Sequence, residues 1–186
     1  LKLTGEDLKL TEKMYKDFVR NGALLSPADK EKLRALDQEL SVLSPQFSEN
    51  VLKATNAFEL WINDEKELAG LPDSAIEAAK IAAEQKNKAG ASKGQWLFTL
   101  HGPSLIPFMT YCSTRALREK MWRASSTKSF GGEFNNSEIV LKIVRLKHQR
   151  AQIMGFKNHA DYVLEERMAQ KPETVFAFIE KLLEPS

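Results

Sequence analysis

The stretch Leu33-Arg-Ala-Leu-Asp-Gln-Glu-Leu-Ser-Val-Leu-Ser-Pro-Gln-Phe-Ser-Glu-Asn-Val51 decides the fold class that we predict for this chain. Its leucine, phenylalanine and valine side chains recur every three or four residues, so they share one face of a helix of about five turns. Pro45 lies inside this pattern, where a proline removes one backbone hydrogen bond and costs about 3 kcal/mol. Because the apolar pattern keeps its phase across Pro45, we expect one kinked helix. A break at Ser44 is the alternative.

Further helices are expected on both sides of this stretch, because apolar residues recur there at helical spacing. Their predicted extents are residues 4–22, 71–88, 101–112, 114–126, 135–154 and 159–169, with a last helix that begins at Pro172. Residues 56–62 and 95–100 are instead typical of short strands, and we pair them antiparallel because isolated strands of this length are not stable. The predicted fold class is therefore mainly α, with many helices and one small antiparallel strand pair.

Particular residues mark the predicted helix ends. Ser26 is expected to cap the helix that begins at Pro27, since proline suits the first turn of a helix. Gly22 and Gly155 are expected to end helices in the left-handed conformation. Asn158 is expected to begin the helix that follows Gly155.

The composition is that of an ordinary globular protein, with 186 residues, 42% of them hydrophobic, and a net charge of +2. This charge gives no general attraction to nucleic acid or membranes, and no apolar run reaches the roughly 18 residues of a membrane span. The single cysteine, Cys112, excludes an internal disulfide and suits a reducing compartment such as the cytoplasm. Because the chain begins at Leu1 without a methionine or a signal-peptide core, we expect its natural start to lie upstream.

One part of the chain is locally basic. Residues 115–150 contain nine lysines and arginines against three glutamates. The simpler interpretation is a set of solvated helix faces. The alternative is a basic surface that attracts an anionic group, such as the carboxylate at the C-terminus of a peptide.

The histidines do not form a recognisable metal motif. In the motif H-E-x-x-H, two histidines one helical turn apart bind zinc and the glutamate acts as a general base. His101, His148 and His159 are followed by glycine, glutamine and alanine, so none of them begins this motif. His101 is expected to make loop hydrogen bonds, and His148 is expected to be exposed on a basic helix. We therefore predict no metal ligand and no catalytic residue in this chain, and its substrate-binding residues are unknown.

Two other candidates are set aside on geometry. His159 and Asp161 point about 200° apart on a helix, so they do not bind one metal ion together with Glu165. They are better interpreted as residues of a first helical turn. Cys112 has no histidine on its own predicted helix to act as a base, and it is expected to be a small buried residue.

Five segments resemble the thimet oligopeptidase-like zinc metallopeptidases in their order and approximate spacing. They are Arg34-Ala-Leu-Asp-Gln-Glu-Leu-Ser-Val-Leu-Ser-Pro-Gln-Phe-Ser-Glu-Asn-Val-Leu52, Ala69-Gly-Leu-Pro72, Trp96-Leu-Phe-Thr-Leu100 with Pro103-Ser104 and Pro107-Phe108, Arg115-Ala-Leu-Arg-Glu-Lys-Met-Trp-Arg-Ala124, and Leu146-Lys-His-Gln-Arg-Ala-Gln-Ile-Met-Gly-Phe-Lys-Asn-His-Ala-Asp-Tyr-Val-Leu-Glu-Glu-Arg-Met-Ala169. The amino-acid sequence of these segments is most similar to the bacterial peptidyl-dipeptidase branch, with oligopeptidase A close to it.

The resemblance implies a helical, two-lobed shell around a deep channel with zinc on its floor. It places the zinc ligands and the general base C-terminal to residues 1–186, so this segment is expected to be an inactive N-terminal or middle part that binds no zinc. The segment would shape one lobe of the channel and restrict entry to short peptides. The parent enzyme would release dipeptides from peptide C-termini.

The expected partners are short peptides, the missing catalytic half and a second copy of the chain. A lone lobe should expose an apolar patch larger than the roughly few hundred Å² usual for monomers, through which it could associate with itself. The loop 130–134, with two glycines between phenylalanines, is expected to touch a partner lobe or a substrate.

Two rival functions remain from the sequence. The first is a non-catalytic helical interaction module. The second is a nucleic-acid binder that stacks bases on aromatic side chains beside the basic helices. Core packing explains most of these aromatic residues more simply, and neither a nucleic acid nor a membrane is predicted as a partner. The aromatic residues concerned are Trp61, Trp96, Phe98, Phe108, Trp122, Phe130 and Phe134.

Overall fold

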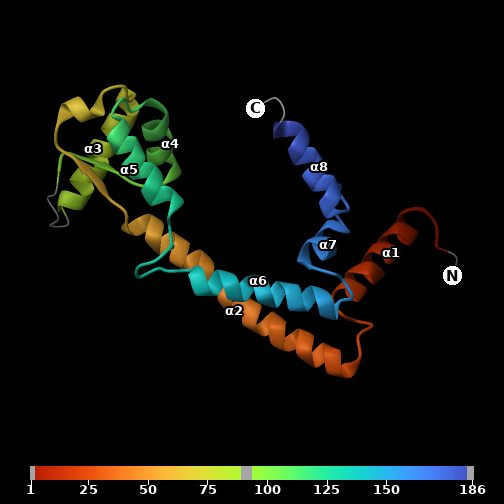
Figure 1. The fold of residues 1–186 in the computed structure, drawn as a ribbon. Coiled ribbons are helices and arrows are strands. Elements are labelled where there is room, and N and C mark those ends of the chain that lie inside the picture. Colours follow the sequence, from red (N-terminus) through yellow and green to blue (C-terminus); the bar gives the residue numbers. More distant parts are fainter. Residues whose placement is uncertain (1–2, 89–93, 184–186) are drawn as a thin grey trace. The chain divides into compact units, whose positions relative to one another are not determined.

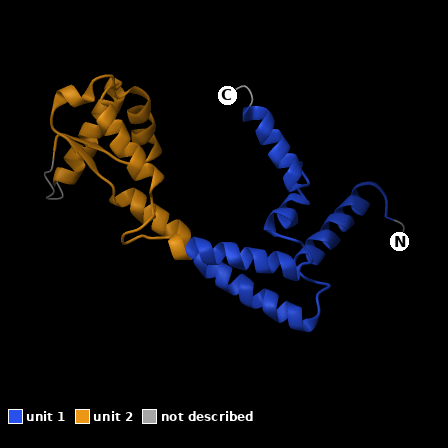
Figure 2. Ribbon diagram, viewed as in Figure 1, with its two compact units in different colours: residues 1–44, 139–186 blue, residues 45–138 orange. Residues whose placement is uncertain are grey.

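The structure, a computed structural model, describes residues 3–88 and 94–183. These residues form eight α-helices, one 3-10 helix and a two-stranded sheet, which confirms the predicted mainly α fold (Figure 1). The chain divides into two compact units (Figure 2). Unit 1 comprises residues 1–44 and 139–186, and unit 2 comprises residues 45–138. No helix in the described ranges is long and apolar enough to cross a membrane.

Unit 2 contains the predicted strand pair. β1 (Leu60–Ile62) and β2 (Trp96–Phe98) run antiparallel, with Leu60 opposite Phe98. Side chains alternate between the two faces of a strand, so Leu60 and Ile62 point to the same side. Both residues, with Phe98, are at most 2% exposed, which identifies this face as the one that packs into the core.

Three helices of unit 2 pack one against the next, and the first of them packs on this sheet. They are α3 (Asp73–Lys88), α4 (Gly102–Tyr111) and α5 (Arg115–Ser126). α3 contacts β2, α4 contacts α3, and α5 contacts α4. Their bounds agree with the predicted helices to within a few residues. Ala79 and Ala83 on α3 are buried.

The core of unit 2 lies between the sheet and these helices. Its buried members are Leu60, Ile62, Leu68, Leu71, Ala79, Phe98, Leu100, Phe108, Cys112 and Met121. The rings of Phe98 and Phe108 meet edge to face, with 4.7 Å between their centroids. Each large apolar side chain buried here contributes about 1.5–3 kcal/mol relative to an exposed one. Cys112 is 2% exposed, which confirms its predicted role as a small buried residue.

The aromatic residues of unit 2 divide between core and surface. Phe98 and Phe108 are fully buried, and Trp61 and Trp96 are partly buried, as core packing requires. Core packing does not account for Trp122, because its side chain is 54% exposed. Met121, its neighbour, takes the buried position instead.

Unit 1 is built from helices. They are α1 (Gly5–Arg20), the first part of α2 (Pro27–Ala57), most of α6 (Ser137–Ile153), α7 (His159–Leu164) and α8 (Pro172–Leu183). α2 continues unbroken through Pro45, so the alternative of a break at Ser44 is wrong. The kink at Pro45 stays a prediction.

The predicted helix ends of unit 1 are confirmed. The Ser26 hydroxyl accepts a hydrogen bond from the Asp29 N–H at 3.1 Å, so it caps the first turn of α2. Gly155 has a φ of 84°, and the N–H of Phe156 after it donates back to the Ala151 carbonyl. This return bond satisfies a carbonyl at the end of α6. Asn158 caps α7 by accepting the Asp161 N–H.

One helix is shorter than predicted. The prediction extended the helix of residues 159–169 to Ala169, whereas α7 ends at Leu164 and turns follow it. Gln170 has a φ of 58°, a left-handed conformation that separates these turns from α8. The apolar spacing of the sequence did not reveal this change of direction.

Unit 1 buries few apolar side chains. Among its described residues these are Leu33, Leu43, Leu146 and Ala151. α1 and α8 bury none, although one face of each is apolar. The large exposed side chains on these two helices are Leu8, Leu10, Met14, Tyr15, Phe18, Phe176, Phe178, Ile179, Leu182 and Leu183. The two units therefore differ sharply in how they are stabilised.

Gly70 tests the packing of unit 2. It lies between the 3-10 helix η1 (Glu65–Leu68) and α3, with a φ of +88°, and a Cβ there would lie 2.3 Å from the Tyr111 carbonyl oxygen. Gly70→Ala should therefore lower the unfolding free energy of unit 2 by about 2–5 kcal/mol, from left-handed strain and backbone overlap. All three tryptophans lie in this unit. Urea unfolding followed by tryptophan fluorescence measures the change.

Gly131→Ala is the matched control. Gly131 has a similar φ of +80°, but nothing lies within 4 Å of the added Cβ. It should cost only the conformational strain, about 1 kcal/mol. Equal losses in the two variants would show that the contact at Gly70 is unimportant.

Candidate functional site

The three histidines lie on three different helices or helix ends. His101 is exposed at the start of α4 in unit 2, whereas His148 is exposed on α6 in unit 1. His159 begins α7 and is partly buried; burial lowers its pKa, and the charges of Lys147 and Arg150 lower it further. Within the described ranges, no group of three histidine, cysteine or acidic side chains could hold a metal ion. That the whole chain binds no metal stays a prediction.

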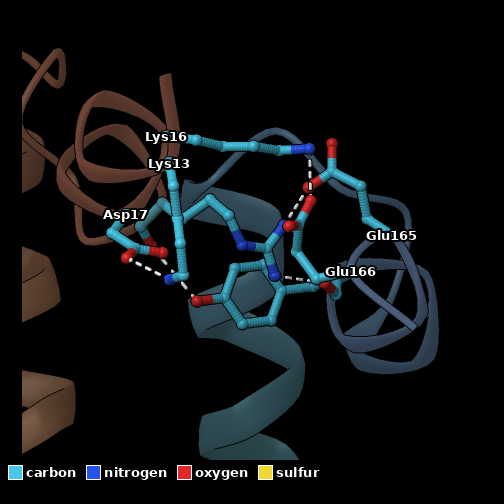
Figure 3. Close-up of polar contacts among 7 residues, drawn as sticks. Lys13, Lys16, Asp17, Glu165 and Glu166 are labelled. Atoms are coloured by element: carbon cyan, nitrogen blue, oxygen red, sulfur yellow. Dashed lines mark hydrogen bonds and ion pairs between the residues drawn. The ribbon is translucent and has the colours of Figure 1, made fainter. Parts of the chain in front are cut away.

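The two glutamates after α7 have ion-pair partners on α1. Glu165 pairs with the Arg20 guanidinium, and Glu166 pairs with the Lys16 ammonium group (Figure 3). Asp161 instead exchanges hydrogen bonds with Asn158 at the start of α7, at 2.8 and 3.0 Å. These carboxylates therefore hold the fold together locally, as expected for Asp161.

Arg20 makes the most contacts in this region. Its guanidinium lies over the Tyr162 ring, 4.3 Å from the centroid, and donates a hydrogen bond to the Tyr162 carbonyl at 2.6 Å. The Tyr162 hydroxyl in turn donates to the Arg20 carbonyl at 3.1 Å. The Arg20 side chain is only 13% exposed, so these contacts are largely shielded from water. A partly desolvated cation over an aromatic ring contributes about 1–2 kcal/mol.

Other groups surround the same ring. The Arg150 guanidinium lies 5.2 Å from the Tyr162 centroid and its Nε donates to Asp37 at 2.8 Å. The Phe156 ring meets Tyr162 edge to face at 5.3 Å. We call Arg20, Arg150, Phe156, Tyr162 and Glu165 the Tyr162 cluster. It connects α1, α6 and α7, and the bond from Arg150 to Asp37 links it to α2; these helices bury few apolar side chains.

The sequence did not predict the Tyr162 cluster. Arg20 and Tyr162 are separated by 142 positions, and no local pattern marks a contact across that distance. The end of α1 and the start of α7 were each predicted, so the two positions were known but their proximity was not. An arginine beside a predicted left-handed stop was the only local signal.

The loop at residues 130–134 is organised by its neighbours. The Asn135 side-chain oxygen accepts hydrogen bonds from the N–H groups of Gly131 and Ser137. Asn136 is 4% exposed, and its amide donates to the Phe47 carbonyl at 3.0 Å. Phe130 is left 78% exposed in this loop. Contact between this loop and a substrate or a partner stays a prediction.

The basic stretch is partly neutralised. Lys142 pairs with Glu39, Arg150 with Asp37, and Arg123 with Glu119. The stretch also belongs to both units, because unit 2 ends at Glu138. The basic side chains of α5 form a surface that is local to unit 2.

Known proteins are similar to the chain along most of its length. The sequence signature described as Peptidase family M3 matches residues 108–186. Oligopeptidase A of Salmonella typhimurium is 39% identical over 179 residues, which are 94% of this chain and 26% of that protein. Probable cytosolic oligopeptidase A of Arabidopsis thaliana is 39% identical over 163 residues, 87% of this chain and 23% of that protein. Dipeptidyl carboxypeptidase of Escherichia coli is 31% identical over 184 residues, 98% of this chain and 26% of that protein.

These relatives are named as peptidases, and the similarity to them covers most of this chain. The chain therefore resembles the thimet oligopeptidase-like family, and its residues 108–186 match Peptidase family M3. The chain spans about a quarter of the length of these relatives. Its identity to the two oligopeptidases A exceeds its identity to dipeptidyl carboxypeptidase, which reverses the order of similarity that the sequence segments suggested.

Arg20→Lys tests the Tyr162 cluster. Lysine keeps the charge but loses the planar group that stacks on the ring and donates to two partners at once. The free energy that protects α1 and α7 from opening should fall by about 1–2 kcal/mol. Hydrogen exchange measured by mass spectrometry on peptides from these two helices tests this, while the tryptophan signal of unit 2 should not change.

Lys13→Gln serves as the control on the same helix. Lys13 pairs with Asp17 at 2.8 Å, but its side chain is 71% exposed (Figure 3). An exposed pair of this kind contributes little to stability, because water and salt screen it. If both variants accelerated exchange equally, the stacking at Tyr162 would not be the source of the protection.

Proposed function

We propose that this chain is part of a zinc-dependent metallopeptidase that cleaves short peptides. The observation that carries the proposal is the 39% identity to an oligopeptidase A over 94% of the chain. When bound, zinc would activate a water molecule for attack on the scissile carbonyl. The described residues do not offer a set of ligands for it. We propose that the zinc site lies in a part of the enzyme outside this chain.

The role that we propose for the chain itself is to shape the substrate channel. Unit 2, with its well-packed core, would supply a rigid wall. Unit 1 would supply the helices that attach this wall to the rest of the enzyme. In this proposal the chain alone is inactive, because it positions peptides but does not polarise or attack the peptide bond.

The remaining part of the enzyme is the partner that we propose for the exposed faces of α1 and α8. The ten large apolar side chains of these two helices are between 41% and 67% exposed. They support the proposal of an apolar surface that is covered in the complete enzyme.

The cleavage mode and the location are finer parts of the proposal. We propose release of C-terminal dipeptides, as the name of the dipeptidyl carboxypeptidase relative suggests. Cleavage of internal peptide bonds is the alternative, and the higher identity to oligopeptidase A favours it. The cytoplasm is the proposed location, supported by the name of the probable cytosolic relative, although an organellar oligopeptidase A also matches.

The proposal is tested by zinc content and peptide cleavage. The 186-residue chain should contain no stoichiometric zinc and should not cleave a quenched nonapeptide. A longer version that includes the residues following this segment in its gene should gain both properties. Mass spectrometry of the products distinguishes dipeptides from internal fragments. Zinc binding and cleavage by the 186-residue chain would contradict the placement of the catalytic site outside it.

A helical interaction module is the alternative function, and the exposed faces of α1 and α8 favour it. The two functions are distinguished by mixing the chain with the separately produced remainder of the enzyme. Restored cleavage would support the peptidase role. The interaction module would be supported if the two parts associated tightly without cleaving the peptide and if the longer version, produced as one continuous chain, were also inactive. Sedimentation of the chain alone at high concentration shows whether the same faces also drive self-association.

A further inference from the structure

We propose that unit 2 carries a docking site for the C-terminal carboxylate of a peptide whose last side chain is apolar. The site is a hollow of about 410 Å³ formed where α4 and α5 meet. Its lining residues are Met109, Arg115, Arg118, Glu119 and Trp122. The choice of a peptide as the ligand rests on the proposed function, whereas the site rests on the arrangement of these side chains.

The spacing on α5 explains why these groups meet. Arg115, Arg118 and Trp122 follow one another at i, i+3 and i+7, so they lie on one face of the helix. This face therefore presents two guanidinium groups followed by an indole ring. Met109 borders the same hollow from α4, and Ile106, one turn before it, is 65% exposed. The hollow thus has a cationic end and an apolar end.

The charges in the hollow leave a cation available for a ligand. Glu119 is the one acidic residue of the lining, and its carboxylate is already paired with Arg123, at 2.8 Å from both Nε and a terminal nitrogen. Arg118 donates to the Cys112 carbonyl, which holds its side chain in place. Within the described parts of the chain, Arg115 has no ion-pair partner. A carboxylate is the natural partner for its planar guanidinium.

The apolar end of the hollow determines which side chain the last residue of the peptide can have. Trp122 is 54% exposed, so its ring offers a surface for an aliphatic or aromatic side chain. Met109 adds a flexible thioether, which adapts to side chains of different shape. A carboxylate next to an apolar side chain is the chemistry of a peptide C-terminus with an apolar last residue. This hollow would therefore hold the free end of a peptide substrate.

The test measures binding without cleavage. The probe is a fluorescein-labelled pentapeptide, four alanines followed by a C-terminal phenylalanine, compared with the same peptide as a C-terminal amide. At low ionic strength, fluorescence anisotropy with the 186-residue chain should give an affinity about fivefold higher for the free carboxylate, the effect of one exposed ion pair. Equal affinities for the acid and the amide would overturn the proposal.

Variants on α5 locate the effect. Arg115→Gln should abolish the preference for the carboxylate, and Trp122→Ala should weaken both peptides by about fivefold through the loss of apolar contact. Lys120→Gln is the matched control, since it removes one positive charge from the same helix outside the hollow. It should keep the fivefold preference. If Lys120→Gln reduced the preference as much as Arg115→Gln, diffuse charge would explain the binding and the site would be rejected.

A nucleic acid is the competing ligand for arginine beside tryptophan. A labelled single-stranded thymidine oligonucleotide that bound more tightly than the peptide, with an affinity falling steeply with salt, would reject the peptide site. Because no peptide is cleaved in these experiments, their failure would remove this docking site and leave the peptidase assignment intact. Failure of the longer version to cleave would instead remove the peptidase assignment.

Discussion

The stacking of Arg20 on Tyr162 is the interaction on which unit 1 depends. Side chains of α1 and α6 meet the tyrosine ring of α7, yet few apolar side chains are buried in this unit. A cation over an aromatic ring, closed by hydrogen bonds between Arg20 and the backbone and hydroxyl of Tyr162, replaces the apolar core that usually fixes helices. Such contacts are directional, so they specify how α1 and α7 meet more strictly than apolar packing would.

Unit 2, in contrast, is stabilised by a buried apolar core. Its sheet of two three-residue strands could not persist alone, because so short a pair is marginal in water. The buried face of the sheet is covered by α3 and the helices packed on it, and the rings of Phe98 and Phe108 meet within that cover. Rigid packing of this kind suits a wall that presents surface groups in fixed positions. The Arg115 and Trp122 side chains project from such a support.

The fold was predictable where local sequence determines it. The long α2 helix, the strand pair and the caps at Ser26 and Gly155 each depend on residues close together in the chain, and each was confirmed. The Tyr162 cluster was not predictable, because it depends on a contact across 142 positions that has no periodic pattern. The hollow at α5 was predicted in part. The basic stretch was visible in the sequence, but the neutralisation of Glu119 by Arg123, which leaves Arg115 available, required the structure.

The uneven stability of unit 1 bears on the proposal that the chain is part of a larger enzyme. Helices of 12–16 residues are marginal in isolation, so α1 and α8, which bury no side chain, need support from elsewhere. α1 receives it at its last residue, where Arg20 is held by Tyr162 and Glu165. α8 contacts α7, and its large apolar side chains are exposed. A surface that covered both apolar faces would therefore stabilise α8 more than α1. If the proposal holds, α1 would be ordered before the lobe is assembled, whereas the order of α8 would depend on assembly.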